Sequence, residues 1–400
     1  MIVLKYGGTS VATLSKMRRV AKRILEHHAR HKRVVVVVSA MGHTTDRLVS
    51  LAHQAVKQPQ KRELDMLLAT GEQVATSLLA MMLHDFGAKA VSLNSFQAGI
   101  YSEGLHTKNK IKDIDTSRIE HYLDEGNIVV ITGFQGYNQT LGDVTTLGRG
   151  GSDTSAVALA AKFHCPCHIY TDVSGIYTCD PRRYVQAKKL SQITYDELIE
   201  LAFLGARVME TRAVEIAKKY QVPLYIAAAN QRSQGTWVKE NHTMMEHNAL
   251  TGASLKDDIL MFSLHRLKEP EHSVAMLFEG LATHEVNVDM ISQTMIEPGV
   301  ISLAFTCDAE DIEAVRIVLD TLKSQYQDVQ IEENNQLSKV SVVGIGMRSQ
   351  PGVAATIFTL FSKHRIPFKL VTTSDISISY TVPKDLAQHA LNVIAEQFNL

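Results

Sequence analysis

A glycine-rich stretch in the first half of the chain holds the densest set of groups that could do chemistry. It reads Thr145-Thr146-Leu147-Gly148-Arg149-Gly150-Gly151-Ser152-Asp153-Thr154. The glycines allow a tight turn and a close approach to a ligand, and Ser152, Asp153 and Thr154 can cap the apolar run 156–163 as a helix. A helix that starts there directs free N–H groups at an anion. The pattern predicts a catalytic, anion-binding loop, and the alternative is an ordinary glycine-rich loop before a capped helix.

Charged side chains and neighbouring loops extend this prediction. Arg149 carries a planar fork suited to a carboxylate or a phosphate, and the Asp153 carboxylate could hold a metal ion or orient a lysine. Two more small-residue loops, Gly7-Gly8-Thr9-Ser10 and Ser39-Ala40-Met41-Gly42, each follow an apolar run typical of a strand. In open α/β sheets, ligands bind beyond the carboxyl ends of the strands. We therefore expect these loops to share one site.

The elements that must position the loops alternate between strand and helix. Apolar runs predict strands at 2–5, 34–38, 90–93, 128–132, 169–171 and 223–226, and helical periodicity predicts helices at 17–28, 63–83, 116–124, 153–163, 194–204 and 208–220. Gly71 inside the second helix predicts a break or a close approach by another group. Thr194 and Glu197 fit a capping box. The alternation predicts a parallel sheet between two layers of helices.

Composition narrows the class of protein. The chain has 400 residues, 45% hydrophobic and 21% charged, with 41 basic against 42 acidic residues and a net charge of −1. This balance argues for a small-molecule ligand and against nucleic acid or an anionic membrane surface. The amino terminus enters a strand pattern without signal-peptide features, and the run Val34 to Val38 is too short to span a bilayer. We therefore expect a cytoplasmic protein of two or three domains.

The cysteines predict reduced thiols rather than a disulfide framework. Cys165, Cys167, Cys179 and Cys307 are few and unevenly spaced. The segment His164-Cys165-Pro166-Cys167-His168 gathers four potential metal ligands, but Pro166 forces an extended chain whose neighbouring side chains point to opposite faces. We assign no metal site, because structural zinc normally uses two separated ligand pairs.

The last third of the chain contains a repeat. Residues 230–256 are polar and irregular, which indicates a domain boundary. Beyond them a shift of 80 residues aligns Leu277-Phe278 with Ile357-Phe358 and His284 with His364. Each copy follows the order strand, helix, strand, strand, helix, so the repeat predicts a small α/β binding module that pairs with itself.

These motifs together resemble the bacterial aspartate kinases (aspartokinases) of the amino-acid kinase superfamily, and the resemblance covers nearly the whole chain. It depends on five segments in order: Lys5 to Ser10, Val38 to Met41 with Thr44-Thr45-Asp46, Ala69 to Gln73, Thr146 to Asp153, and Thr171-Asp172 with Tyr177 and Asp180-Pro181-Arg182. It implies an α/β fold, with a three-layer parallel-sheet kinase domain over 1–245. Two tandem ACT domains (βαββαβ) would follow, over 257–330 and 337–400.

The resemblance also implies the reaction and the residues that perform it. ATP, with Mg²⁺, would phosphorylate the side-chain carboxylate of L-aspartate, a step toward lysine, threonine and methionine. That carboxylate is already ionised at neutral pH, so no general base is required. The implied catalytic residues are Lys5 and Asp153, with Asp153 orienting either Lys5 or the magnesium ion. The N–H groups of Gly7, Gly8 and Ser39 would hold the transferring phosphate together with Lys5. The implied aspartate-binding residues are Thr45, Glu72, Arg149, Gly150 and Ser152, and the implied ATP-binding residues are Lys5, Gly7, Gly8, Ser39, Thr171, Asp172, Tyr177, Asp180, Arg182 and Arg207.

The repeated tail would sense lysine, threonine or both, and would join copies of the chain into a homo-oligomer. The implied effector residues are Asn287, Asp289, Gln293, Ser374 and Asp375. Asp289 would take the effector's ammonium group, and the alternative for it is a solvated carboxylate in a turn before a strand. Two departures from the family pattern bear on these roles. Arg207 and Thr211 stand where many relatives have lysine and proline, and the loop 268–273 lacks the glycine that the second copy keeps at Gly352.

Two other functions are weighed against this one. A sister kinase for glutamate or N-acetylglutamate would lack the paired tail and the Ala-Thr-Gly-Glu segment. A catalytically dead amino-acid sensor would not need Lys5, Glu72, Arg149 and Asp153 together. This chain has the paired tail, the Ala-Thr-Gly-Glu segment and all four of these residues, which favours an active aspartate kinase.

Overall fold

The chain folds into two compact units in the computed structural model. The structure describes residues 1–206, 208–230, 233–240 and 248–400. The first unit consists of residues 1–176, 189–202 and 207–243, and the second consists of 177–188, 203–206 and 244–400. Two segments of the predicted kinase domain, 177–188 and 203–206, thus fold with the second unit. The exact limits of the three predicted domains stay predictions.

The first unit is built on an eight-stranded sheet with the order β10-β12-β11-β9-β1-β2-β6-β3. All neighbouring strands of this sheet are parallel except β11 and β12, which are antiparallel. The strands are β1 (Ile2–Tyr6), β2 (Val34–Val38), β3 (Ala90–Leu93), β6 (Ile128–Thr132), β9 (Cys167–Thr171), β10 (Gln192–Ile193), β11 (Leu224–Ala228) and β12 (Thr236–Val238). The predicted parallel sheet is therefore confirmed.

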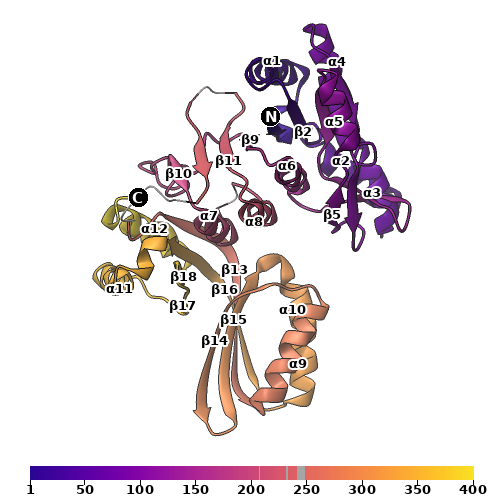
Figure 1. Cartoon of the computed structure of the whole chain (residues 1–400). Coiled ribbons are helices and arrows are strands. Elements are labelled where there is room, and N and C mark those ends of the chain that lie inside the picture. Colours follow the sequence, from indigo (N-terminus) through magenta and orange to yellow (C-terminus); the bar gives the residue numbers. More distant parts are fainter. Residues whose placement is uncertain (207, 231–232, 241–247) are drawn as a thin grey trace. The chain divides into compact units, whose positions relative to one another are not determined.

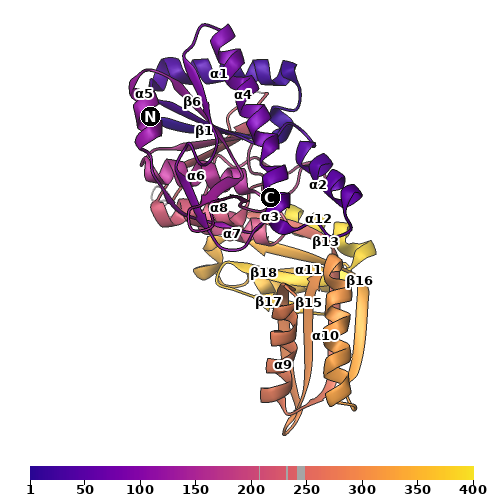
Figure 2. The same ribbon diagram turned by 90° about the vertical axis from the view of Figure 1, so that its right-hand side faces the viewer.

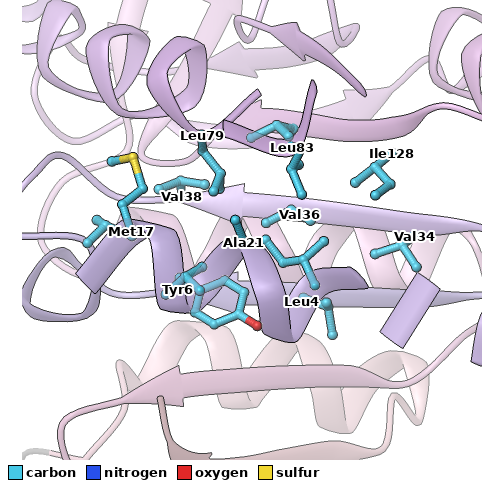
Figure 3. Packing of buried hydrophobic residues seen from close by; sticks show 14 of the residues in the cluster. Leu4, Tyr6, Met17, Ala21, Val34, Val36, Val38, Leu79, Leu83 and Ile128 are labelled. Carbon is cyan, nitrogen blue, oxygen red and sulfur yellow. The ribbon is translucent and has the colours of Figure 1, made fainter. Parts of the chain in front are cut away.

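The core of this unit lies between the sheet and helices α1 (Leu14–His31) and α4 (Thr70–Asp85) (Figures 1 and 3). Every residue of β1 and β2 is buried, as a run of consecutive apolar residues predicts for a central parallel strand. Alternate residues Val34, Val36 and Val38 join this cluster (Figure 3). Helix α6 (Gly151–Lys162) packs against β1 and β2 and is not part of that cluster, which gives the three-layer arrangement.

Of the two outcomes predicted for Gly71, the structure contains the close approach at Gly71 itself, and the helix break lies two residues earlier, at Ala69. Helix α3 (Lys61–Leu68) ends before Ala69, and α4 begins at Thr70. A side chain at Gly71 would meet the Cβ atom of Ala40 at 2.9 Å, so the glycine lets α4 approach the loop after β2. The run Lys61–Asp85 has the length and hydropathy of a membrane span, but half of its most apolar window is buried inside the protein, as in a core helix.

The start of α6 differs from the prediction. Ser152, Asp153 and Thr154 do not precede the helix as caps, because they lie in its first turn. Gly150 takes the N-cap position with φ of 65°, a left-handed conformation that glycine adopts at little cost, and its carbonyl accepts from the N–H of Asp153. The Thr194–Glu197 capping box is confirmed by reciprocal bonds of 3.3 and 3.2 Å at the start of α7 (Tyr195–Phe203).

A four-stranded sheet in the first unit was not predicted. Its order is β5-β4-β7-β8, and it comprises β4 (Ile100–Glu103), β5 (Lys110–Ile114), β7 (Gln135–Asn138) and β8 (Asp143–Thr146). The strands are short and partly polar, so they carry no clear apolar period. Strand β8 leads directly into the glycine-rich loop. The remaining helices of this unit are α2 (Thr44–Ala55), α5 (Ser117–Asp124) and α8 (Thr211–Tyr220).

The second unit has a six-stranded antiparallel sheet with the order β14-β15-β13-β16-β18-β17. Its elements are β13 (Gly252–Lys268), α9 (Pro270–Thr283), β14 (Val288–Glu297), β15 (Val300–Asp308), α10 (Ile312–Gln325), β16 (Gln330–Val343), α11 (Val353–Lys363), β17 (Val371–Thr373), β18 (Ser377–Pro383) and α12 (Lys384–Gln397). Helices α9 and α10 lie side by side along one part of the sheet (Figure 2).

The two copies of the repeat share their longest strands. The carboxyl-terminal half of β13 packs with α9 and α10, whereas residues 252–256 of β13 pair with the carboxyl-terminal half of β16. Leu250 and Ala253 belong to the hydrophobic cluster of α11 and α12. The second copy is therefore completed by a strand that precedes the first copy in the sequence. Periodicity within each copy gives no sign of this exchange.

Candidate active site

Lys5 and Asp153 form the charged centre of the first unit's loops. Lys5 lies on β1 and is 8% exposed, and its Nζ atom is 2.6 Å from Oδ1 of Asp153 in the first turn of α6. The strand and the helix are neighbours because α6 packs on β1. The contact with Lys5 fits one of the two roles expected for Asp153, and the other role, toward the magnesium ion, stays a prediction. A buried lysine held by one carboxylate oxygen keeps further N–H donors for an anion.

The backbone donors around Lys5 differ in part from the prediction. Gly7, Gly8 and Ser39 were expected to offer N–H groups to a phosphate. The N–H of Gly7 instead donates to the carbonyl of Tyr170 at 3.1 Å, and the N–H of Ser39 donates to Tyr6 at 3.2 Å, because the sheet pairing continues by one residue. The N–H of Gly8 donates to no described residue.

A second free backbone donor comes from the start of α6. The N–H of Ser152 also has no partner among the residues that the structure describes, as expected for a first helical turn. Its hydroxyl is 2.8 Å from the hydroxyl of Ser39, which brings the loop after β2 against the helix. Gly8 lies beside the same loop, since a Cβ atom there would meet the carbonyl of Ala40 at 2.7 Å. Lys5, Gly8 and Ser152 thus gather positive potential at one end of the sheet.

Glu72 is a buried carboxylate near the same loop. It is 3% exposed, and its Oε1 accepts from the N–H of Ala40 at 3.0 Å. Its Oε2 has no hydrogen bond of normal geometry among the described residues, although Gln135 lies close by. Burial raises the pKa of Glu72 to about 7. Such a carboxylate can accept a cationic group, and Thr45, partly exposed on α2, lies on the helix that begins just after the Ala40 loop.

Arg149 lies in the glycine-rich loop, exposed to solvent. Its side chain makes no hydrogen bond or ion pair with another described residue, so the guanidinium is available to a ligand. Two residues that the sequence did not single out support this loop from α8. The Arg212 guanidinium donates to the carbonyl of Leu147, and Glu210 fills the space above Gly150, where a Cβ atom would lie 2.4 Å from the Cβ of Glu210.

The charge of Glu210 also interacts with the site. Burial raises the pKa of Glu210, while the positive charges of Arg212 and Arg149 lower it and Asp153 raises it. For Glu210 and Arg212, the sequence indicated only that a helix starts near 208. It did not indicate that this helix contacts the loop 147–150, because that contact joins residues that are distant in the sequence.

Thr171 and Asp172 line a small cavity of about 100 Å³ at the carboxyl end of β9. Ser10 and the basic residues Lys16 and Arg19, which the sequence did not suggest, line it as well. The predicted nucleotide residues Tyr177, Asp180 and Arg182 belong instead to the segment that folds with the second unit, where Arg182 holds both carboxylate oxygens of Asp180. Arg207 lies outside the described residues.

No group of three or more His, Cys, Asp or Glu side chains within the described ranges is arranged to hold a metal ion. In the segment 164–168, His168 packs on Tyr225 and Trp237, with ring centroids 4.9 and 5.7 Å away. Burial lowers the pKa of His168 to about 3. His168 is therefore a packing residue of this aromatic cluster.

The predicted effector residues separate into two groups in the second unit. Asn287 and Gln293 are exposed on or next to β14, and Asp289 forms an ion pair with the fully buried Lys339. Ser374 and Asp375 line a cavity of about 520 Å³ together with Arg348 and the start of α11 at Gly352. Asn287, Asp289 and Gln293 do not line this cavity. The Asp289 carboxylate, expected to take an effector's ammonium group, is thus already paired with a lysine.

Comparison with known proteins decides the family. The model of the amino acid kinase family matches residues 1–228, and an ACT domain model matches residues 340–398. An aspartokinase of Geobacillus stearothermophilus is 46% identical over all of this chain and 97% of its own length. Aspartokinase 2 of Bacillus subtilis is 44% identical, with coverage of 100% and 98%. The chain belongs to the aspartokinase family.

Solved structures agree with this assignment. Aspartokinase III of E. coli, in complex with aspartate and ADP, superposes with a TM-score of 0.84 over the whole of both chains at 23% identity, which supports the fold. Aspartate kinase from Synechocystis is 36% identical, with a TM-score of 0.56 over 100% of this chain and 70% of its own. The family's reaction is ATP-dependent phosphorylation of the side-chain carboxylate of aspartate, toward lysine, threonine and methionine, and the expectation of such an enzyme is confirmed.

Proposed function

We propose that the chain phosphorylates aspartate with Lys5, Asp153, Glu72 and Arg149 as the central groups of the site. The observation that carries this proposal is the buried Lys5–Asp153 pair beside the free N–H groups of Gly8 and Ser152. Phosphoryl transfer requires positioning and charge stabilisation far more than covalent help from the protein. A cationic pocket at a helix start supplies both.

On the phosphate side, Lys5 holds the transferring group and Asp153 orients Lys5. A side-chain carboxylate oxygen of aspartate attacks the γ-phosphorus, and the bond from that phosphorus to the oxygen bridging to the β-phosphate breaks, so ADP leaves. Negative charge on the phosphoryl oxygens is met by the Lys5 ammonium and the N–H groups of Gly8 and Ser152. The aspartate nucleophile is already ionised at neutral pH.

On the substrate side, Arg149 binds the α-carboxylate of aspartate through its paired N–H groups. Glu72 accepts the α-ammonium group, which its buried Oε2 is suited to do. Thr45 and the backbone at Gly150 and Ser152 complete the pocket. A substrate with an acylated amino group would lack the charge that Glu72 needs, which favours aspartate over N-acetylated amino acids.

For the nucleotide, Thr171 and Asp172 line the proposed ATP pocket, with Gly7 and Ser39 contributing shape rather than N–H groups. Tyr177, Asp180, Arg182 and Arg207 are proposed to contact ATP on the strength of the family resemblance. Mg²⁺ enters as part of the ATP substrate and supplies charge neutralisation between the β- and γ-phosphates when bound. Lys16 and Arg19 add positive charge at the same cavity.

For regulation, we place an amino-acid effector in the cavity of about 520 Å³ in the second unit. Arg348 and the start of α11 would hold its carboxylate, and Asp375 would hold its ammonium group. A solved structure of E. coli aspartokinase III contains lysine and aspartate. Lysine, threonine or both are therefore the ligands to test.

Assembly and location complete the proposal. Strand β14 is an edge strand with Ile291, Met295 and Ile296 each at least half exposed. A long apolar edge favours pairing with another sheet, so we propose a homo-oligomer that forms through the second unit. The balanced charge of the chain fits a cytoplasmic enzyme without nucleic-acid or membrane partners.

Arg149→Ala tests the substrate side of this proposal. Loss of a charged hydrogen bond costs about 1.5–3 kcal/mol, so the KM for aspartate should rise roughly 10- to 100-fold while the KM for ATP stays near normal. Steady-state kinetics with each substrate varied in turn would show this. An equal rise in both KM values would mean that Arg149 contacts phosphate.

A further inference from the structure

Asp65 is a completely buried carboxylate on α3 that none of the proposed catalytic roles uses. Its exposed fraction is 0%, yet it takes part in four hydrogen-bond contacts with three residues from two segments. The Nδ1 atom of His106 lies 2.8 Å from Oδ2, and the hydroxyl of Thr146 donates to Oδ1 at 2.6 Å. The N–H of Thr107 donates to both oxygens at 3.2 and 3.1 Å. A buried carboxylate with this many donors is held in one position.

The partners of Asp65 lead directly to the loop that carries Arg149. Thr146 is the last residue of β8 and precedes Leu147. Thr107 lies in the connection between β4 and β5, and its carbonyl would be 3.1 Å from a Cβ atom on Gly148. The N–H of Asn109 donates to the carbonyl of Thr146 at 3.1 Å. One carboxylate thus fixes both the entry to the loop and the segment packed against it.

The segment that Asp65 holds is conformationally costly without it. Thr107 has φ of 71°, a left-handed conformation that a β-branched residue rarely adopts. Such backbone strain persists only where surrounding contacts impose it. The two bonds from the Thr107 N–H to Asp65 supply these contacts, and His106 adds a second anchor because its Nε2 atom lies 3.5 Å from Asp143.

The loop is also held from a different element, α8. Arg212 donates to the carbonyls of Leu147 and Asn109, the latter at 3.3 Å. The loop at 147–149 therefore has two supports: Arg212 of α8, which bonds the loop and Asn109, and the segment that Asp65 fixes. Arg149, in contrast, has no described side-chain partner that would position it. Its placement depends on the backbone that these two supports hold.

We propose that Asp65 is a positioning residue for aspartate binding: through Thr146, His106 and Thr107 it fixes the loop that presents Arg149, without touching the substrate. This inference rests on the proposed role of Arg149. It assigns a function to the segment 104–109, which becomes one wall of the aspartate-binding loop. Lys5, on β1, lies outside this support, so the effect should fall on aspartate rather than on ATP.

The test is Asp65→Asn, which keeps the shape and removes the charge. We expect the KM for aspartate to rise about tenfold or more, since small displacements of a binding group have effects of this size, while the KM for ATP changes less than twofold. Glu197→Gln is the matched control, because Glu197 is also a buried carboxylate of the first unit and caps α7 through Thr194. This control should lower the melting temperature without changing the KM for aspartate.

Thr146→Val removes a single bond to Asp65 and keeps the side-chain shape, so it carries the test if Asp65→Asn does not fold. It should raise the KM for aspartate by a smaller factor with the same lack of effect on ATP. Arg149→Ala separates this inference from the proposal beneath it. If Arg149→Ala leaves the KM for aspartate unchanged, the role of Arg149 is wrong. If Arg149→Ala raises it but neither Asp65→Asn nor Thr146→Val does, or if Asp65→Asn raises both KM values equally, the role of Asp65 is overturned.

Discussion

The Nζ atom of Lys5 lies 2.6 Å from Oδ1 of Asp153, with both side chains almost buried. The pair joins β1 to the first turn of α6, so the central sheet and the glycine-rich loop meet at one charge pair. Removing one member of a buried pair leaves the other uncompensated, which is costly. The same contact therefore serves both the geometry of the site and the stability of the first unit.

Lys5→Met should reduce kcat by about two to three orders of magnitude, the size found for loss of a preorganised charge-stabilising donor. The KM for aspartate should change little, because the only part of either substrate that we propose Lys5 contacts is the transferring phosphoryl group. Lys57→Met, an exposed lysine in the connection after α2, provides the control. A Lys5→Met variant with normal circular dichroism and near-normal kcat would remove Lys5 from the mechanism.

Asp153→Asn should lower kcat less than Lys5→Met does, because Lys5 stays present but loses its orienting carboxylate. We expect a fall of roughly tenfold, in line with the contribution of a charged hydrogen bond. A magnesium titration of kcat distinguishes the two roles expected for Asp153. A large increase in the Mg²⁺ concentration needed for half-maximal activity would show that Asp153 serves the metal instead of Lys5.

The pKa of Glu72, raised to about 7 by burial, predicts a pH dependence of substrate binding. Glu72 must be ionised to accept the aspartate ammonium group, so kcat/KM for aspartate should rise as pH increases from 6 to 8. A pH profile measured with saturating ATP gives this. Glu72→Gln should have a high KM for aspartate and no such rise, and a wild-type profile that is flat across this range would contradict the assignment.

The same raised pKa makes a prediction about stability. Between the ordinary value of 4.5 and about 7, the folded state binds a proton that the unfolded state has lost, so the contribution of Glu72 to stability falls as pH rises through this window. Glu72→Gln should therefore be more stable than wild type above pH 7, by up to about 3 kcal/mol. Urea unfolding at pH 5 and pH 8 measures this, and equal differences at both values would show that Glu72 is not desolvated.

The effector proposal is tested by melting temperature and inhibition together. Lysine, threonine or both should raise the melting temperature and inhibit, because a ligand that inhibits must bind the inactive state more tightly. Arg348→Ala should abolish both effects and leave the uninhibited kcat unchanged. If Gln293→Ala relieves inhibition and Arg348→Ala does not, the effector binds on β14, and if neither amino acid has an effect, the second unit serves assembly alone.

Local sequence patterns predicted the features of this protein that depend on interactions between residues close together in the sequence. The run of valines in β2 predicted a central strand, Gly71 predicted a close approach within the helical run 63–83, and Thr194 with Glu197 predicted a capping box. Each of these features is decided by residues that are neighbours in the sequence. The motif order also predicted the family, although no single motif would have done so.

The remaining features depend on contacts between distant segments. The N–H groups of Gly7 and Ser39 are taken up by sheet pairing, a consequence of register that local composition does not indicate. In the sequence, Asp65 cannot be distinguished from any other acidic residue on an amphipathic helix. Only the fold shows that His106 and Thr146 contact it. The pairing of Asp289 with Lys339 likewise joins residues from the two copies of the repeat. Contacts between buried charged residues that are distant in the sequence could therefore not be predicted from it.

The central claim is that this site transfers the γ-phosphoryl group of ATP to the side-chain carboxylate of aspartate. The most direct measurement is to trap the acyl phosphate with hydroxylamine and identify the product by mass spectrometry, with aspartate, glutamate and N-acetylglutamate supplied separately with ATP and Mg²⁺. We predict that aspartate alone gives a hydroxamate, formed on its side-chain carboxylate, and that Lys5→Met gives none. A hydroxamate of glutamate or N-acetylglutamate in preference to that of aspartate, or none from any of the three, would contradict the claim.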